Sequence, residues 1–183
     1  MVEADVWVTD APQKHVENGM VQNLEPEPQV ESESEEIMKL AVTLRRETQL
    51  ETARSHYEWV YRNIQSESYS PQDRGALWAV RNKKGDCTEM AQLFAALCRA
   101  SQIPARVMGG YICPNNSNLN ANQFHNWAEF FDGSTWQIVD PQSQIFMKKQ
   151  SDYIATEIVQ SDSIMGKAHR YRFSGDGLKV EMK

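Results

Sequence analysis

The sequence predicts one α+β domain in which helices precede an antiparallel sheet. Amphipathic patterns over residues 37–64 are followed by an almost wholly apolar helix over residues 87–98. After Pro104 the composition becomes strand-like and contains the hairpin signal Asp132-Gly133. With 183 residues, the chain is long enough for one domain with a sizeable core and too short for two.

The leading segment differs in charge from the rest of the chain. Residues 1–36 hold ten acidic side chains and one basic one, whereas the remaining 147 residues carry a net charge of +3. Val6 to Thr9 is predicted as a short strand, and the proline- and glutamate-rich residues 22–36 as an extended, solvated linker. We therefore divide the chain into an acidic segment, 1–36, and a folded domain, 37–183.

Composition also bounds the partners. The body has no basic stripe, so no nucleic-acid partner is expected, and no apolar run reaches the roughly 18 residues of a membrane span. The first residues lack the basic start and apolar stretch of a signal peptide. This predicts a cytoplasmic protein by default, with export open if the sequence is trimmed. Oligomeric state is not predicted.

Metals and disulfides are not expected either. The three cysteines are an odd number without a C-x-x-C pair, and the four histidines are far apart in the sequence. No disulfide framework, zinc site or other cofactor is therefore predicted.

Two capping-box patterns, each a Ser or Thr followed three residues later by Glu, precede amphipathic stripes and predict the first two helices. They are Ser32 with Glu35, before a helix through Leu44, and Thr48 with Glu51, before a helix through Ile64. The next stretch, 65–75, is rich in serine and predicts a loop.

The third helix is predicted to be central and buried, because Met90 to Cys98 is apolar nearly all round. Asp86 is its expected N-cap, and Glu89 completes a capping box. This places Cys87 in the first turn of the helix.

Cys87 is the best candidate for a nucleophile. At a helix N-terminus, unpaired N–H groups and the positive end of the helix dipole favour a thiolate. Cys98 lies three turns deeper among apolar residues, and Cys113 precedes a proline in a loop. Taken alone, a cysteine is more often a buried packing residue, so a partner base is needed.

Strands are predicted on both sides of a polar, asparagine-rich loop, 113–123, which we expect to overhang a cleft. The expected strands are 105–112, 126–131, 135–139, and a final hairpin of 168–173 with 178–182.

The hairpin signal brings together a histidine and a carboxylate. A two-residue turn at Asp132-Gly133 places His125 directly opposite Asp140 on the adjacent strand, with Cβ atoms roughly 5 Å apart. An odd-length loop or a bulge breaks this pairing. In such a geometry the carboxylate can hold the imidazole in one tautomer, as a catalytic triad requires.

These residues lie in three blocks that closely resemble the core of the transglutaminase-like superfamily, over about residues 37–147. The blocks are Gly85-Asp86-Cys87-Thr88-Glu89 with its following helix and Ile103-Pro104-Ala105-Arg106-Val107, then His125-Asn126-Trp127-Ala128-Glu129, and Trp136-x-x-Val139-Asp140-Pro141.

The resemblance implies a papain-like fold and a catalytic domain over residues 37–183. It also implies Cys87 as nucleophile, His125 as general base and acid, and Asp140 as the residue that orients His125. The implied activity is cysteine-dependent acyl chemistry at amide bonds of a peptide or protein substrate through a thioester. Hydrolysis is the leading expectation, and the alternatives are glutamine acyl transfer to amines or a non-catalytic peptide-binding module.

Two departures narrow the resemblance. The chain lacks the acidic loop of the calcium-dependent animal transglutaminases and the C-x-x-C pairs of the glycan-removing amidases. It therefore looks like the bacterial type with a single core. The acidic leading segment is either a remnant of a preceding domain or an inhibitor that lies in the cleft.

Several other residues have two interpretations each. Trp78 is either a second oxyanion donor or a core aromatic, while Trp127 and Trp136 are expected to pack around the site. Arg106 is expected in a structural ion pair. The charges that precede Cys87 either attract an acidic substrate or are solvated, and they are Arg81, Lys83 and Lys84.

Overall fold

The computed structural model describes residues 20–115 and 119–159. The strand predicted at Val6 to Thr9 and the hairpin predicted over 168–182 lie outside these ranges. The helices are α1 (Glu35–Leu44), α2 (Gln49–Asn63), α3 (Gly75–Asn82) and α4 (Cys87–Ala100). The strands are β1 (Gln65–Ser66), β2 (Lys84–Gly85), β3 (Ala105–Ile112), β4 (His125–Phe131), β5 (Trp136–Asp140), β6 (Ile145–Phe146) and β7 (Tyr153–Val159).

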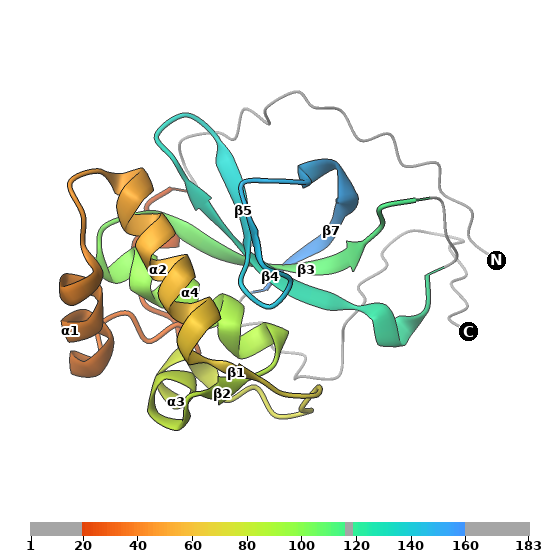
Figure 1. The fold of residues 1–183 in the computed structure, drawn as a ribbon, viewed down its shortest axis with the longest axis horizontal. Helices are drawn as coiled ribbons and strands as arrows, with labels where there is room; N and C mark the ends of the chain where they lie inside the picture. The colour runs from red at the N-terminus through yellow and green to blue at the C-terminus, as the bar shows by residue number, and fades with distance from the viewer. Residues whose placement is uncertain (1–19, 116–118, 160–183) are drawn as a thin grey trace.

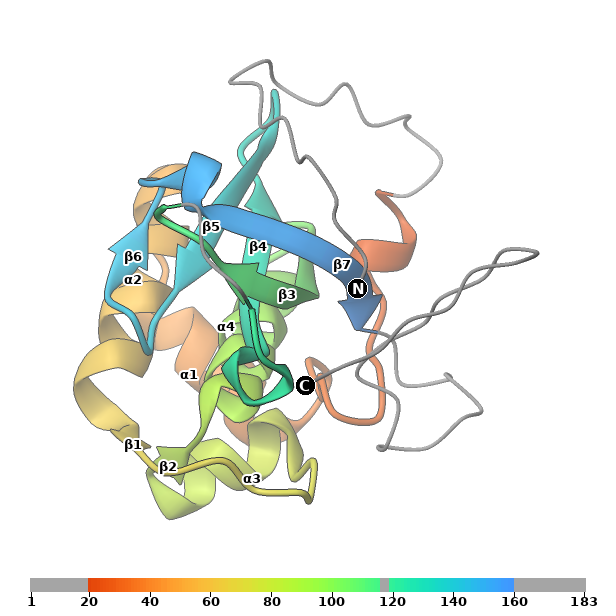
Figure 2. The ribbon, with the colours of Figure 1, turned by 90° about the vertical axis from the view of Figure 1, so that its right-hand side faces the viewer.

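The architecture is an antiparallel sheet with helices gathered on one side, as the sequence predicted (Figure 1 and Figure 2). The sheet has five strands in the order β6-β5-β4-β3-β7. A second, two-stranded sheet pairs β1 with β2 in parallel. Within the described ranges, none of the helices combines the length and apolar character that crossing a bilayer requires.

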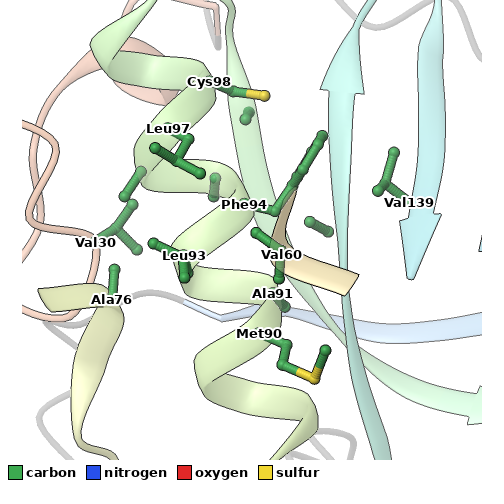
Figure 3. Packing of buried hydrophobic residues seen from close by; sticks show 14 of the residues in the cluster. Val30, Val60, Ala76, Met90, Ala91, Leu93, Phe94, Leu97, Cys98 and Val139 are labelled. Carbon is green, nitrogen blue, oxygen red and sulfur yellow. The ribbon is translucent and has the colours of Figure 1, made fainter. Parts of the chain in front are cut away.

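Helix α4 forms the centre of the core, between the other helices and the sheet (Figure 3). Its apolar side chains are inaccessible to solvent nearly all round, as its composition predicted. Phe94 points toward the sheet and meets Phe130 edge-on, with ring centroids 6.2 Å apart. Burying each such aromatic side chain contributes about 2 to 3 kcal/mol, so this contact fixes α4 against β4.

Two of the predicted helix starts are confirmed. Thr48 and Glu51 form the capping box of α2, and Asp86 and Glu89 form that of α4. In each box the N-cap side chain accepts from a first-turn amide and the glutamate returns to the N-cap amide.

The predicted capping box at Ser32 and Glu35 was wrong. Helix α1 begins at Glu35, and its N-cap is Ser34, whose hydroxyl accepts from the Ile37 amide at 3.3 Å. Ser32 is buried in the preceding turn, where its amide donates to the Val30 carbonyl at 2.7 Å.

Helix α3 was not predicted, and neither was β1, which lies within the expected loop 65–75. The N-cap residue of α3 makes no capping hydrogen bond of its own. Instead, the Ala76 amide donates to the Gln29 carbonyl at 2.9 Å, and the Leu77 amide donates to the Glu31 carboxylate at 3.1 Å. The partners of this helix end are therefore distant in the sequence.

The prediction that residues 22–36 form a solvated linker was also wrong. Val30 is 3% exposed and belongs to the main core. The buried Arg99 guanidinium donates to the Glu25 carbonyl at 2.7 Å and to the Glu27 carboxylate at 2.8 Å. These bonds fasten the segment to α4 and satisfy a buried charge.

The β4–β5 hairpin turns over residues 132–135 rather than at Asp132-Gly133 alone. The Asp132 carboxylate accepts from the amides of Ser134 and Thr135 at 2.8 and 2.9 Å. Gly133 adopts a φ of +100°, a conformation that glycine accepts without steric cost. These bonds centre the turn one residue later than predicted.

The predicted pairing of His125 with Asp140 was consequently wrong by two places. Ala128 lies opposite Val139, and this register, continued, puts Asp140 opposite Trp127. Residues two apart on a strand share a face. Asp140 and His125 therefore remain diagonal neighbours on one side of the sheet.

Candidate active site

Cys87 is the first residue of α4, directly after the N-cap Asp86, and is only partly buried. Asp86 accepts from the amides of Thr88 and Ser70, each at 2.8 Å. The cap therefore fixes the first turn of α4 and ties the loop before α3 to it. This is the position that the sequence predicted for the nucleophile.

An ion pair between Arg74 and Glu89 supports this end of the helix. Arg74 Nη2 lies 2.8 Å from Glu89 Oε2, and the Arg74 guanidinium also lies over the Trp78 ring at 3.8 Å from its centroid. Burial raises the pKa of Glu89, but the hydrogen bonds from Arg74 outweigh it and hold that pKa below its usual value. Trp78 thus packs against the core and Arg74.

The structure brings His125 and Asp140 into direct contact. His125 Nε2 lies 2.7 Å from Asp140 Oδ2, and the two side chains are 13% and 1% exposed. The Cys87 side chain also interacts with the His125 ring and favours its protonated form. The structure therefore brings the thiol, the imidazole and the carboxylate together, with a hydrogen bond between the last two.

The charged groups around His125 favour a protonated imidazole. Burial disfavours the charged ring, but the hydrogen bonds and negative charges of Asp140 and Cys87 outweigh it and raise the pKa of His125 to about 10. Burial likewise opposes the charge of Asp140, but His125 holds the pKa of Asp140 below its usual value. This arrangement suits an imidazolium held beside the Asp140 carboxylate.

A second contact joins the same two elements, and the sequence analysis missed it. Asn126 Nδ2 donates to Thr88 Oγ1 at 2.9 Å. Thr88 directly follows Cys87 in the sequence, and Asn126 directly follows His125. The bond therefore holds the start of α4 to the start of β4. Its only sequence signal was the adjacency.

Asp140 has two further donors that were also missed. The Ser143 amide donates to Oδ1 at 3.0 Å, and the Tyr153 hydroxyl donates to Oδ2 at 2.9 Å. Ser143 lies in the turn after β5, and Tyr153 begins β7. A buried carboxylate needs such donors, because losing them leaves its charge without solvation.

The other two cysteines are less suited to act as nucleophiles. Cys98 is fully buried, and burial raises the pKa of its thiol well above the usual value. Burial also raises the pKa of the Cys113 thiol. Neither is attached to the His125–Asp140 pair by a contact recorded in the described part of the chain.

The remaining predicted residues have structural contacts. Arg106 forms the expected ion pair, with Nη2 2.6 Å from Glu129 Oε2, and lies over the Trp136 ring at 4.1 Å from its centroid. Trp127 is buried in a small cluster behind His125. Arg81 Nη2 lies 2.7 Å from Glu36 Oε1, in an ion pair that is exposed to solvent.

Among residues 20–115 and 119–159, no three His, Cys, Asp or Glu side chains come together in a way that could hold a metal ion.

The sequence profile of the Transglutaminase-like superfamily matches residues 38–141, which include Cys87, His125 and Asp140. The chain belongs to this superfamily. No protein with a curated description matches it.

Solved structures agree with this family. The chain is similar to a candidate cysteine protease from Cytophaga hutchinsonii, with 25% identity and a TM-score of 0.62 over 79% of this chain and 48% of that one. It is similar to the periplasmic domain of TgpA from Pseudomonas aeruginosa, bound to ethylmercury, with 21% identity and a TM-score of 0.55 over 72% and 51% of the two chains.

A candidate protease from Parabacteroides distasonis has 13% identity and a TM-score of 0.51, over 78% of this chain and 30% of that one. The chain thus spans about half the length of the first two structures and less than a third of the last. Together the profile and the first of these structures confirm the papain-like, transglutaminase-like fold that the sequence predicted.

Proposed function

We propose that this protein is a cysteine hydrolase that cleaves amide bonds in a peptide or protein through a thioester on Cys87. The observation that carries the proposal is the 2.7 Å contact of His125 Nε2 with Asp140 Oδ2, with Cys87 interacting with the same imidazole from the start of α4. A thiol at a helix start, an imidazole and a buried carboxylate are the parts that activated-thiol catalysis needs.

The proposed reaction has two steps. The Cys87 thiolate attacks the amide carbonyl carbon, and the imidazolium of His125 gives its proton to the departing amine as the C–N bond breaks. The neutral imidazole then takes a proton from water, whose oxygen attacks the thioester; the C–S bond breaks, the carboxylic acid leaves, and the Cys87 thiolate and the imidazolium are restored. The Cys87 amide is the first candidate to hold the oxyanion in both steps.

Asp140 acts on this cycle through His125. Its carboxylate orients the ring and stabilises the imidazolium, both before attack and after the acyl group has formed. The raised pKa of His125, about 10, and the lowered pKa of Asp140 support an ion pair between these two side chains.

Two similar structures are described as candidate proteases, and this supports hydrolysis over transfer. Transfer of a glutamine acyl group to an amine uses the same thioester and is the second candidate. The difference is whether water or an amine reaches the thioester. A non-catalytic peptide-binding module is the third candidate, and the presence of Cys87, His125 and Asp140 together argues against it.

A peptide library incubated with a labelled primary amine separates the three by intact-mass spectrometry. Hydrolysis gives fragments that have together gained one water, whereas transfer gives peptides that have lost ammonia and gained the amine. Cys87→Ala should abolish either reaction, while Cys113→Ala, a matched change at a cysteine outside the site, should retain it.

Binding of peptides without any mass change would support the binding module and contradict the proposal.

The same assay is run after dialysis against EDTA. We expect unchanged turnover, because neither the reaction nor the described side chains call for a metal. Turnover lost with EDTA and restored by one added metal would contradict that expectation.

A further inference from the structure

Tyr153, the first residue of β7, contacts the acidic end of the site from outside the stretch that defines the family. Its side chain is buried, and its hydroxyl donates to Asp140 Oδ2 at 2.9 Å. This is the same oxygen that His125 Nε2 approaches at 2.7 Å. The family profile ends at residue 141, so Tyr153 lies beyond it.

The ring of Tyr153 is held firmly in this position. It packs edge-on against Trp127, with centroids 5.0 Å apart, and both belong to the cluster behind the site. The backbone pairs with Ile112 on β3. A phenol fixed in this way can aim its single O–H at one acceptor with little loss of side-chain entropy.

The neighbouring strand is adapted to this close approach. A Cβ added to Gly110 would lie 2.0 Å from the Ile154 carbonyl oxygen, so only glycine fits between β4 and β7 at this point. Gly110 is also the β3 partner of His125. The absence of a side chain at Gly110 therefore lets β7 lie close to β3 at the position that pairs with His125.

We propose that Tyr153 is a positioning residue of the active site, which holds Asp140 toward His125 and keeps that buried carboxylate ionised. The proposal rests on the proposed function, since it assigns Tyr153 a role in the same site. The reason is chemical: Asp140 is 1% exposed, and each hydrogen bond donated to the carboxylate stabilises its charged form. Losing one donor should raise the pH at which Asp140 gains a proton and releases the imidazolium.

The groups that surround Asp140 decide how a pH profile is interpreted. His125 of β4 contacts Asp140 directly, and Cys87 of α4 interacts with the His125 ring. The negative charge of Asp140 also acts on the Tyr57 phenol of α2. Burial raises the pKa of Tyr57 and of Tyr153, so both phenols stay neutral in acid. Asp152 directly precedes Tyr153, so the variant Asp152→Asn serves as a control for any effect of the Asp152 charge on the pH profile.

The test measures alkylation of Cys87 by iodoacetamide against pH, which needs no substrate. In the unaltered protein the rate should stay high toward acid until Asp140 is protonated. Tyr153→Phe, which keeps the ring, should move this acid limb upward by about one pH unit, the effect of one hydrogen bond to a charged group. Tyr111→Phe, a matched change at a buried tyrosine of β3, should leave the limb in place.

A double variant separates positioning from packing. In the Asp140→Asn background, Tyr153→Phe should cause no further shift, because the hydroxyl acts only through the carboxylate. An acid limb unchanged in Tyr153→Phe, or equal further shifts in both backgrounds, would overturn the proposal.

The unaltered protein gives a second measurement that does not depend on folding of a variant. With tyrosine labelled at Cζ, the Tyr153 resonance should shift with the same midpoint as the acid limb of Cys87 alkylation. A resonance that does not move through this range would overturn the proposal. Because neither experiment uses turnover, their failure is distinct from a failure to find amide hydrolysis.

Discussion

His125 Nε2 lies 2.7 Å from Asp140 Oδ2, although the two residues are not directly opposite each other in the β4–β5 ladder. The ladder places Ala128 opposite Val139, so Asp140 and His125 meet along a diagonal. Diagonal neighbours on one face of a sheet are within reach of long side chains. The pair therefore depends on a shared face of the sheet and on the reach of the imidazole side chain, and not on direct cross-strand pairing.

Asp140→Asn tests whether this contact serves catalysis. The amide keeps the shape but removes the charge, so the imidazolium is less stable and the ring less well oriented. We expect turnover to fall on the order of 10- to 10⁴-fold, less than in Cys87→Ala or His125→Ala. Steady-state rates for the three variants, with circular dichroism as the check of folding, measure this.

The double variant Asp140→Asn with His125→Ala completes the cycle. It should be no slower than His125→Ala alone, because the carboxylate acts through the imidazole. If the two losses multiply, Asp140 acts independently of His125, and its assigned role is incorrect.

How far the site could be predicted depends on how local each signal is. The Asp86–Glu89 capping box is contained within four residues, so the start of α4 and the position of Cys87 could be derived from the sequence. The β4–β5 hairpin could be derived too, but not its register. That register depends on the Asp132 side chain, which accepts two amides and moves the turn by one residue.

Cysteine labelling tests the assignment of the nucleophile. Iodoacetamide near neutral pH should modify Cys87 first, Cys113 more slowly and Cys98 slowest. The reason is that Cys87 lies at the start of α4 and interacts with His125, whereas burial raises the pKa of the other two thiols. Peptide mapping over time gives the three rates in the folded protein. Similar rates at all three cysteines would exclude a special thiolate at Cys87.

Thr88→Val tests the bond that joins α4 to β4. Valine keeps the branched shape but cannot accept from Asn126, so the start of α4 is held less firmly against β4. We expect Cys87 alkylation to fall by roughly 3- to 10-fold and the free energy of unfolding to fall by about 1 kcal/mol.

The matched control is Thr43→Val, which removes an exposed hydroxyl bonded to the Lys39 carbonyl on α1. It should leave Cys87 alkylation unchanged. An equal fall of alkylation in both variants would show that the Thr88–Asn126 bond has no particular effect on the site.

Stability in acid should depend on His56, which is fully buried between Cys98 Sγ at 3.7 Å and Ser101 Oγ at 3.4 Å. Burial lowers the pKa of His56 to about 4, against the hydrogen bond with the Ala41 backbone, which raises it. The neutral ring therefore stabilises the fold above the unfolded-state pKa of about 6.5. This contribution is lost as the pH falls from there through about 4.

Urea unfolding of the unaltered protein and of His56→Gln, at several pH values, measures this contribution. Between neutral pH and pH about 4, the unaltered protein should lose up to about 3 kcal/mol more free energy of unfolding than the variant. Parallel losses in the two proteins would show that His56 does not titrate on unfolding.

Other parts of the structure could not be predicted, because their partners are remote. The N-terminus of α3 is satisfied by Gln29 and Glu31, more than 40 residues earlier. Strand β7 is an edge strand without a turn signal, and the hydrogen bond of Tyr153 to Asp140 exists only once β7 lies beside β3. Such contacts are set by tertiary packing, which neither periodicity nor capping patterns describe.

Trapping of the thioester tests the central claim most directly. The protein is mixed with a peptide substrate found in the library screen, quenched in acid within the first turnovers and analysed by intact-mass and peptide-level spectrometry. We predict an acyl group attached to Cys87. It should accumulate before the product appears and then decline as water or an added amine reacts with the thioester. Turnover by Cys87→Ala, or product formation with no acyl group on Cys87 at any quench time, would contradict the account.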